Sequence, residues 1–448
     1  MALPASTNVP RDTGRRRTVT FQTGRAVALG TAAALALTGC LGPAGSARVS
    51  NADASGDGTL RIGLILDNTG QQNFLNAPQL AAAKLAVQDI NAAGGHKGKP
   101  VELLPETIST DTAAQARALV AAKADVVIGP TDSSRAAAAI DVLANAKVAV
   151  ISPANSAGAL SNYKSNGYYF RTSASDVAQA SVLAKLAKDG GAKTVAVLHE
   201  EGGYGKEVAA AVDDAAKQSG LDAVADAEFT PGQAQQAAAG VKAANPDAVV
   251  LVASEGAQGA IAELNNAGLA GKKLILSDEA VSRYGSGLGA RALDGTRGVL
   301  PGVFPSAAFQ KSLVGVDHGL KDMVFAAETY DAVILAALAA AAAEDDAGTS
   351  IAASLVAVSG GTAGAADQPV GQPASQPASQ PAGKACASYK DCVDALRAGQ
   401  RPDYDGQSGR IAFDAHGDIT EANYMVYTYG PDNLAKMTGT ETATSSGG

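Results

Sequence analysis

Two short apolar segments without polar alternation constrain the fold of this chain more than any other feature. They are Val126–Ile128 and Val148–Ile151, and both are rich in β-branched residues. A strand with one face in water alternates apolar and polar residues, whereas a strand of a parallel sheet is buried on both faces and is apolar throughout. An Ala-rich segment that favours a helix separates the two. We therefore predict a β-α-β unit within a parallel sheet.

Each of these predicted strands is followed by a proline and then by small polar residues. Thr131–Ser134 follow the first strand, and Ala154–Ser156 follow the second. In open parallel sheets, ligands bind beyond the carboxyl ends of the strands. A helix that begins there also directs backbone N–H groups at the same place. Two adjacent loops of donors, with no Lys or Arg directed between them, favour a small carboxylate over a polyphosphate.

The alternation of strands and helices occurs in two similar units of ordinary domain size. The first begins with a strand at Arg61–Leu66, and the second begins after Phe170-Arg171-Thr172. A third segment, from about Val303, contains a long apolar run that we predict to be a buried helix. Tyr330 and Asp331 interrupt any membrane-spanning interpretation of this run.

Two regions have compositions that cannot form a core. Residues 367–383 are a low-complexity insertion of Pro, Gln, Ser and Ala, and residues 433–448 are mostly small and polar. We predict that both are disordered and solvated.

The N-terminus indicates export. Arginines at positions 11, 15, 16 and 17 precede an apolar run at Ala26–Leu37, which is too short to span a membrane comfortably. Leu37-Thr38-Gly39-Cys40 resembles a bacterial lipobox, in which the Cys is diacylated and becomes the first mature residue. An ordinary signal peptide with an unrelated Cys is the alternative. Arg16-Arg17 leave the choice between the general and the twin-arginine export routes open.

Charge and cysteine content agree with an exported protein. The chain has 35 Lys and Arg against 44 Asp and Glu; five arginines and one acid precede Cys40, so the remainder has a net charge near −13. Such a chain has no attraction for nucleic acid. Cys386 and Cys392 are expected to form a disulfide that closes a loop of about seven residues and contributes about 2 kcal/mol. A redox Cys pair or a zinc site would need other spacing or further ligands.

The residues provide little support for an enzyme. The four histidines show no ligand spacing, and neither Gly-x-Ser-x-Gly nor His-Glu-x-x-His occurs. Glu200-Glu201 with Asp278-Glu279 could mimic a glycosidase carboxylate pair. The glycines of Gly285–Gly289 do not directly follow a strand, so they form a poor dinucleotide loop. We predict no enzymatic activity, no cofactor and no metal site.

Several short motifs, taken in order, resemble the leucine/isoleucine/valine-binding family of solute-binding proteins, which serve ABC importers. The resemblance extends from about Arg61 to Tyr429. The motifs are Asp89-Ile90-Asn91-x-x-Gly94-Gly95, Ile128-Gly129-Pro130, Ile151-Ser152-Pro153-Ala154, Phe170-Arg171-Thr172, Tyr204-Gly205, Tyr330-Asp331-Ala332 and Gly409-Arg410-Ile411-x-Phe413-Asp414-x-x-Gly417-Asp418.

The resemblance implies an α/β fold of two doubly wound parallel-sheet lobes joined by three crossovers, the type I periplasmic-binding-protein fold. Residues 58–171 with 303–415 are then lobe 1, and residues 172–302 with 416–432 are lobe 2. A signal peptide (1–39) and a tether (40–57) precede them. The resemblance implies a monomeric, extracytoplasmic lipoprotein, held on the membrane through Cys40, that delivers a small zwitterion such as an amino acid to an ABC permease.

The family resemblance also implies which residues bind the ligand. Its α-carboxylate would be held in lobe 1 by Ser133, the backbone at Ala154 and Ser156, and its α-ammonium in lobe 2 by Glu279, with Asp278 adjacent. Tyr204 would be the lobe-2 aromatic, and Phe74 a lid on lobe 1. Taken singly, Ser133 and Ser156 could be helix caps, Tyr204 core packing and Glu279 a solvated loop acid.

Departures from the family pattern keep the ligand open. Ala253-Ser254-Glu255 stand where the family often has an aromatic residue, and Asp132 and Asn155 replace smaller or neutral residues. The alternatives are the same fold with an amide- or urea-type solute, or a lipoprotein regulator that binds a protein partner.

Overall fold

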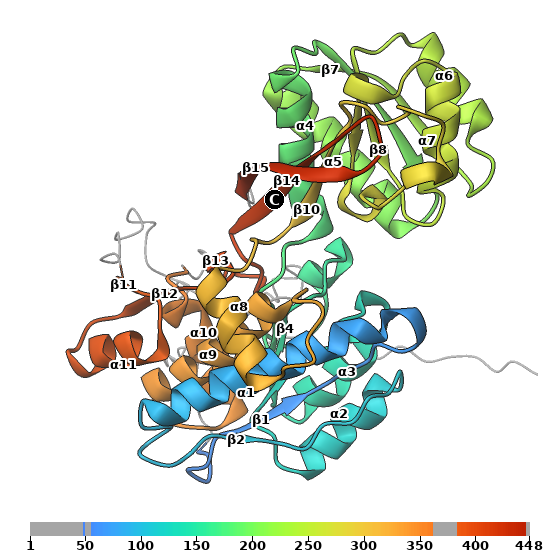
Figure 1. Ribbon diagram of the computed structural model, residues 1–448. Coiled ribbons are helices and arrows are strands. Elements are labelled where there is room, and N and C mark those ends of the chain that lie inside the picture. Colours follow the sequence, from blue (N-terminus) through green and yellow to red (C-terminus); the bar gives the residue numbers. More distant parts are fainter. Residues whose placement is uncertain (1–47, 50–54, 362–382, 445–448) are drawn as a thin grey trace, which may run out of the picture. The chain divides into compact units, whose positions relative to one another are not determined.

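The computed structural model describes residues 48–49, 55–361 and 383–444. The predicted signal peptide, the predicted lipidation residue Cys40 and nearly all of the predicted insertion lie outside the described residues. Elements carry the labels of Figure 1.

Five parallel strands form one sheet, in the order β2-β1-β3-β4-β5, and this sheet defines the first lobe. Val126 and Ile128 pack on one face of the sheet and Val127 on the other, so the strands are buried on both sides, as their uninterrupted apolar sequence predicts. Helices α1, α8, α9 and α10 cover one face, and α2 and α3 cover the other (Figure 1). The elements are β1 (Arg61–Leu64), α1 (Asn76–Ala92), β2 (Glu102–Leu103), α2 (Thr112–Ala121), β3 (Val126–Ile128), α3 (Ser133–Asn145), β4 (Ala149–Ser152), β5 (Tyr169–Arg171), α8 (Ala307–Val316), α9 (Ala326–Ala343) and α10 (Gly348–Val358).

A second sheet, in the order β15-β14-β10-β9-β8-β6-β7, defines the second lobe. Strands β6 to β10 are parallel, and β14 and β15 extend the sheet with antiparallel pairs. Helices α4 and α5 pack on one face, and α6 and α7 on the other. The elements are α4 (Gln179–Asp189), β6 (Thr194–Glu200), α5 (Gly203–Ser219), β7 (Asp222–Phe229), α6 (Gln235–Ala243), β8 (Ala248–Val252), α7 (Ala257–Asn266), β9 (Leu274–Leu276), β10 (Arg297–Pro301), β14 (Glu421–Tyr429) and β15 (Ala435–Thr444).

The chain passes between the two sheets three times: after β5, after β10 and before β14. This confirms the predicted α/β class with two doubly wound lobes and three crossovers. The residue boundaries assigned to the lobes stay a prediction. Short 3-10 turns complete the fold: η1 (Gly70–Leu75), η2 (Gly158–Asn162), η3 (Asp176–Ala178), η4 (Gly271–Lys273), η5 (Asp278–Ala280) and η6 (Gly285–Gly287).

Helix α9 is the core helix of the first lobe. Among the described residues it is the one helix long and apolar enough to cross a membrane, but 78% of it is buried inside the protein. Its carboxylate Asp331 is fully buried and accepts hydrogen bonds from the Tyr404 hydroxyl at 2.7 Å and from the backbone N–H groups of Gln407 and Ser408 at 2.9 and 2.7 Å. A buried charge needs such partners. Asp331 therefore fixes the turn between two strands of the third segment.

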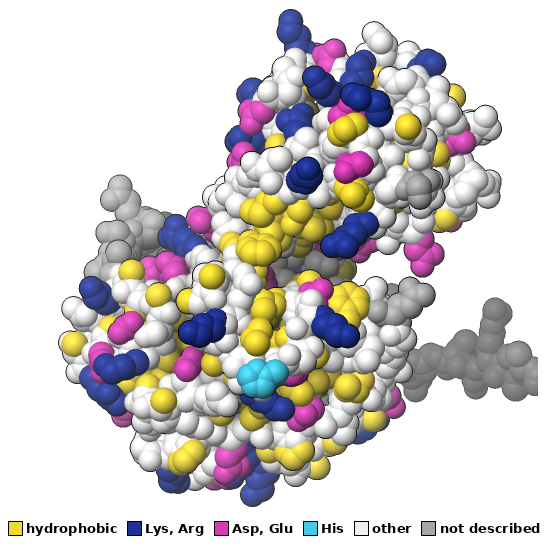
Figure 2. Space-filling model, viewed as in Figure 1, with side chains coloured by type: hydrophobic (Ala, Val, Ile, Leu, Met, Phe, Trp, Pro, Cys, Tyr) yellow, Lys and Arg dark blue, Asp and Glu magenta, His cyan; other side chains and the backbone are white. Residues whose placement is uncertain are grey.

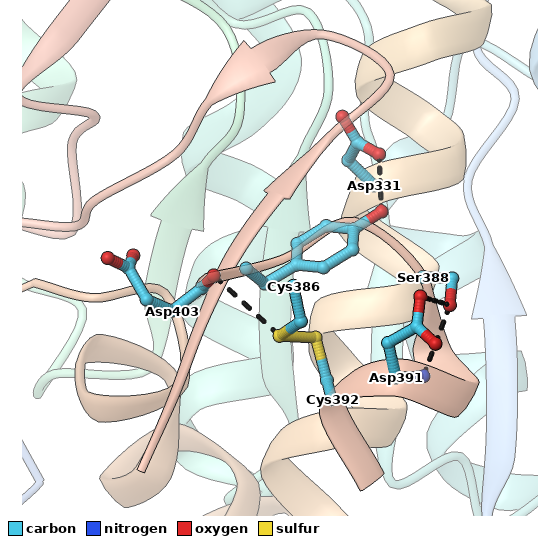
Figure 3. The surroundings of a disulfide bond; sticks show 7 residues. Asp331, Cys386, Ser388, Asp391, Cys392 and Asp403 are labelled. Carbon is cyan, nitrogen blue, oxygen red and sulfur yellow. Dashed lines mark hydrogen bonds between the residues drawn. A yellow bond between two sulfur atoms is a disulfide. The ribbon is translucent and has the colours of Figure 1, made fainter. Parts of the chain in front are cut away.

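A small three-stranded sheet packs beside α9 and contains the predicted disulfide. Cys386 and Cys392 are bonded, with their Cα atoms 5.3 Å apart (Figure 3). Cys392 is fully buried against the core of the first lobe. The elements are β11 (Lys384–Cys386), α11 (Tyr389–Arg397), β12 (Pro402–Gly406) and β13 (Gly409–Arg410).

The prediction that residues 433–448 are disordered is wrong for residues 435–444. They form β15, which pairs with β14 along its whole length, and Ala443 is buried. Local composition suggested a solvated tail because its residues are small and polar. However, threonine fits a strand well, and β14 supplies the backbone partners that the tail cannot supply itself. Residues 445–448 lie outside the described residues.

The predicted tether at 40–57 is also partly wrong, because the described parts of it are attached to the first lobe. Arg48 is 9% exposed. The backbone N–H of Gly56 donates to Asp345 at 2.8 Å, and that of Gly58 donates to Asp346 at 3.0 Å. Polar composition was the basis of the prediction, and it does not reveal a partner almost 300 residues away.

The apolar run predicted to be a buried helix forms α9, and α8 precedes it as a separate helix in the same segment. Sequence patterns did not predict β7 or α6. Strand β7 lies at the edge of its sheet and alternates exposed with half-buried residues. Its Ala- and Asp-rich sequence has low strand propensity, so pairing with β6 determines its conformation.

Arg171 connects the crossovers at the edge of the first lobe. Its guanidinium is fully buried and pairs with both carboxylate oxygens of Asp418, at 2.7 and 2.8 Å. It also donates to the Ser161 hydroxyl at 2.7 Å and to the Ala157 carbonyl at 2.9 Å. A bidentate Arg–carboxylate pair holds a specific geometry. This ion pair therefore joins the first crossover, the third crossover and the loop that follows β4.

We expect Arg171→Ala to lower the free energy of unfolding by about 3–5 kcal/mol, because it leaves the Asp418 carboxylate buried without its cation. Urea unfolding followed by circular dichroism measures the change. Arg397→Ala is the control, since the pair of Arg397 with Asp394 is exposed on both sides and should contribute little. Equal losses in the two variants would contradict the role given to Arg171.

Candidate functional site

The first loop of the candidate site follows β3 and is held by an internal carboxylate. Asp67 is fully buried and accepts hydrogen bonds from the backbone N–H groups of Thr131 at 2.9 Å and Asp132 at 3.1 Å. Burial raises the pKa of Asp67, and these two N–H groups oppose the shift. The first N–H groups of this loop therefore stabilise Asp67 and are not available to a ligand.

Ser133 connects this loop to the next one. Its Oγ accepts hydrogen bonds from the backbone N–H groups of Ser156 at 3.1 Å and Ala157 at 3.3 Å. A hydroxyl has two acceptor positions and one proton. Because two N–H groups occupy the acceptor positions, the Ser133 hydroxyl can still donate its proton. The two loops predicted to lie beside each other do so.

The second loop follows β4, and hydrogen bonds of the Ser152 and Asn155 side chains fix its position. Ser152 Oγ donates to the Pro130 carbonyl at 2.8 Å and accepts from the N–H of Asn155 at 2.9 Å. The fully buried Asn155 side chain donates to the Thr131 carbonyl at 3.0 Å and accepts from the Tyr169 hydroxyl at 3.2 Å. Asn155, which departs from the family pattern, therefore links the two loops.

A buried carboxyl lies behind Ser156. The N–H of Asp176 donates to the Ser156 carbonyl at 2.7 Å, and the Ser156 hydroxyl bonds to the Asp176 carboxyl. Asp176 is 8% exposed. Burial raises its pKa to about 7, with further contributions from the charges of Asp278 and Glu279. Three carboxyl groups therefore lie near one another where the first crossover meets the second lobe.

The second-lobe side of the site is the turn η5 after β9. Asp278 Oδ1 accepts hydrogen bonds from the Tyr204 hydroxyl at 2.5 Å and from the Gln179 amide at 2.7 Å. Burial raises the pKa of Glu279, the neighbouring Asp278 raises it further, and a hydrogen bond with the Ser254 side chain opposes this. Asp278 is thus fixed in position, and both carboxyl groups are in an environment that a cation would stabilise.

Residues from both lobes line a cavity of about 540 Å³. Ala154 and Ser156 line it from the first lobe, and Asp278 and Glu279 from the second. Much of the remaining wall is apolar, and Figure 2 shows hydrophobic side chains gathered over the region of β10 and β14. The apolar lining residues larger than alanine are Leu300, Pro301, Val303, Phe304, Pro305, Met323, Val324, Phe325, Ile419, Met425 and Tyr427.

Three of the six predicted ligand-binding residues, Ala154, Ser156 and Glu279, line this cavity. Ser133 and Tyr204 lie behind it and act on its wall through Ser156 and Asp278. Phe74 lies on η1, is 49% exposed and does not line the cavity. The ligand-binding roles of all six stay predictions.

Sequence reasoning missed Asp176 and Gln179, which position Ser156 and Asp278. The available signal was their place shortly after Phe170-Arg171-Thr172, where the chain enters the second lobe. Within the described part of the chain, no three His, Cys, Asp or Glu side chains are grouped to hold a metal ion.

Known proteins are similar to this chain in sequence. A model of the periplasmic binding protein family matches residues 59–382. Leu/Ile/Val-binding protein homolog 3 from Brucella melitensis is 30% identical over 237 residues, which are 50% of this chain and 62% of that protein. The leucine-, isoleucine-, valine-, threonine-, and alanine-binding protein of Pseudomonas aeruginosa is 31% identical over 36% of this chain and 44% of that protein. The matches thus span less than two thirds of these relatives.

Solved structures share the fold over most of the chain. The branched-chain amino acid transporter substrate binding protein LivJ from Streptococcus pneumoniae, in complex with isoleucine, has a TM-score of 0.57 at 22% identity and covers 86% of this chain and 99% of its own. A solute binding protein from R. palustris, in complex with 4-hydroxybenzoate, has a TM-score of 0.60 at 16% identity and covers 86% of this chain and 98% of its own.

We expect the raised pKa of Asp176 to make stability depend on pH. The pKa of a carboxyl in the unfolded chain is near 4, and that of Asp176 in the folded protein is about 7. The folded state therefore binds this proton more tightly, and stability falls as pH rises from about 4 through about 7. Urea unfolding at several pH values should show a shallower decline for Asp176→Asn than for the wild type.

Asp222→Asn, at an exposed position on β7, is the control and should run parallel to the wild type. A decline in Asp176→Asn as steep as in the wild type would contradict the assignment.

Proposed function

Because the chain belongs to the periplasmic binding protein family, we propose that it is an extracytoplasmic solute-binding lipoprotein that captures a small zwitterion and delivers it to an ABC permease. The zwitterion is a branched-chain or other amino acid. The relatives from Brucella and Pseudomonas, named for such amino acids, support this class of ligand.

The observation that carries the proposal is the charge of the cavity wall. Asp278 and Glu279 face the cavity, and Asp176 lies close behind them. Among the described residues that line the cavity, Arg410 is the one base, and it pairs with Glu421 at 3.4 Å. Carboxylates without a cation in a partly buried site favour a positively charged group. An α-ammonium provides that group.

The opposite wall suits a carboxylate. Ser156 lines the cavity on a loop that Ser133 fixes from behind, and the Ser156 side chain is the hydroxyl that this wall presents. A ligand with one charge for each wall stabilises the closed state, in which the walls approach each other. Only in that state do both the ammonium and the carboxylate of the ligand have partners in the protein. The proposed binding mode therefore couples capture to closure.

An aromatic acid is the second candidate, because one structural neighbour is in complex with 4-hydroxybenzoate and Phe304, Phe325 and Tyr427 contribute to the apolar wall. Such a ligand has no ammonium, so it would leave Asp278 and Glu279 without a cationic partner. Charge therefore favours the zwitterion. A thermal-shift screen against the twenty amino acids, simple amides, urea and benzoates separates these classes, and no response to any of them favours a protein partner.

For the best amino acid in that screen, we expect Glu279→Gln to reduce affinity by about thirty- to several-thousand-fold, because a partner of the buried ammonium is lost. Ser133→Ala should cost about 1–3 kcal/mol of binding free energy. Titration calorimetry measures both.

The control is Asp322→Asn, which removes a charge from the same cavity at a position where the carboxylate accepts the N–H of Val324. Its affinity should stay close to that of the wild type. If Glu279→Gln retains wild-type affinity while Asp278→Asn does not, Asp278 is the ammonium partner. Wild-type affinity in both variants contradicts an ammonium at this wall.

We expect Cys40→Ala to abolish attachment to the membrane, because the proposed acyl chains have no other thiol at the processing site. Membrane fractionation and labelling with a palmitate analogue measure the effect. A variant that still labels and sediments with membranes would contradict the proposed anchor.

A further inference from the structure

Glu328 is the one carboxyl group in the described part of the cavity wall that a simple zwitterion leaves without a partner. It lies in the first turn of α9 and lines the cavity. The other acidic side chains of this wall have partners: the proposed α-ammonium for two of them, Arg410 for the third and a backbone N–H for the fourth. They are, in that order, Asp278, Glu279, Glu421 and Asp322.

Contacts with two crossovers determine where Glu328 lies. Its backbone carbonyl accepts a hydrogen bond from the Thr172 hydroxyl at 2.9 Å, at the first crossover. Its carboxylate lies against Gly302, at the second crossover, where a Cβ would be 3.0 Å from Glu328 Oε1. Gly302 also has a φ of +95°, which other residues rarely adopt. Glycine at this position therefore leaves room for the carboxylate beside the chain that joins the two lobes.

The protein supplies no cation to Glu328. Burial raises the pKa of Glu328 to about 7, its own backbone N–H opposes the shift, and the charge of Asp331 on the same helix raises the pKa further. Among the described residues, no Lys, Arg or His contributes to this shift. A cation beside a carboxyl group in such surroundings stabilises the ionised form. Glu328 is therefore suited to bind a positive charge that comes from the ligand.

The wall on both sides of Glu328 is apolar and partly aromatic. Val303 and Phe304 follow Gly302 at the second crossover, and Met323–Phe325 lead into α9; all of them line the cavity. Methylene groups of a basic side chain pack on such a surface while the charged end reaches a polar group. Aromatic faces also attract cations. This wall therefore fits a side chain with an apolar stem and a cationic end.

We propose that the ligand is an amino acid with a basic side chain, and that Glu328 binds its second cation. The proposal rests on the proposed function, because the α-ammonium and the α-carboxylate keep the partners assigned to them there. Glu328 is then the residue that determines specificity. An aliphatic amino acid would leave its carboxyl group in an apolar wall without a partner, which costs free energy of binding.

Lysine and norleucine test the proposal, because norleucine is lysine without the ε-ammonium group. Titration calorimetry on the full chain with L-lysine, L-arginine and L-norleucine measures the three affinities. We expect lysine or arginine to bind about ten- to a hundred-fold more tightly than norleucine, the range for a hydrogen bond between charged groups.

Glu328→Gln keeps the shape of the side chain and removes its charge. We expect this variant to bind lysine about ten- to a hundred-fold more weakly and norleucine at least as tightly as the wild type, so that the preference disappears. The control is Glu344→Gln, at the exposed C-terminal end of the same helix, which should retain the preference. Should Glu328→Gln fail to fold, the comparison of ligands on the wild type still decides.

Three results would overturn the proposal while leaving capture of a zwitterion intact. The first is norleucine binding to the wild type as tightly as lysine and arginine. The second is a preference for lysine that persists in Glu328→Gln, because another carboxylate would then bind the second cation. The third is an equal loss of both affinities in that variant, which shows a structural role. No binding of any amino acid would instead refute the proposed function, and this proposal with it.

Discussion

The buried ion pair between Arg171 and Asp418 is the interaction on which the arrangement of the site depends. One guanidinium joins the end of β5, the third crossover and the carbonyl of Ala157 in the loop after β4. Asn155 and Ser133 then fix that loop to the loop after β3. The geometry of the first-lobe wall is therefore set by contacts between segments more than 200 residues apart in the sequence. Removing an arginine that touches no ligand would loosen the whole wall.

The sequence predicted well where local pattern and tertiary environment agree. Val126–Ile128 and Ala149–Ser152 are apolar on both faces because helices cover both sides of their sheet. The alternation of such strands with Ala-rich helices is sufficient to predict the α/β class, and the order of short motifs predicts the two lobes. Prediction failed where a distant partner decides the conformation. The polar tail after Asn433 becomes β15 only because β14 offers it an edge.

The candidate site shows the same limit at the level of single side chains. The sequence located Ser133 and Tyr204 near the site, but it could not show that one supports the backbone of Ser156 and the other the carboxylate of Asp278. It also gave no reason to separate the N–H groups of the first loop, which Asp67 uses, from the Ser133 hydroxyl. Hydrogen-bond partners have to be known before a polar residue can be assigned to a ligand or to the protein itself.

Asp331 has a consequence beyond the turn that it fixes. Members of this family work outside the cytoplasm, so α9, with its 18 mostly apolar residues, must pass the membrane without remaining in it. An aspartate near the centre of a membrane helix costs about 2.5–3.5 kcal/mol of insertion free energy, whereas a leucine or valine favours insertion by only about 0.3–0.6 kcal/mol. Glu328 adds to this cost one turn earlier. If the chain is exported unfolded by the general route, the carboxylate that the folded protein stabilises with four hydrogen bonds also favours complete passage of the chain over arrest in the bilayer.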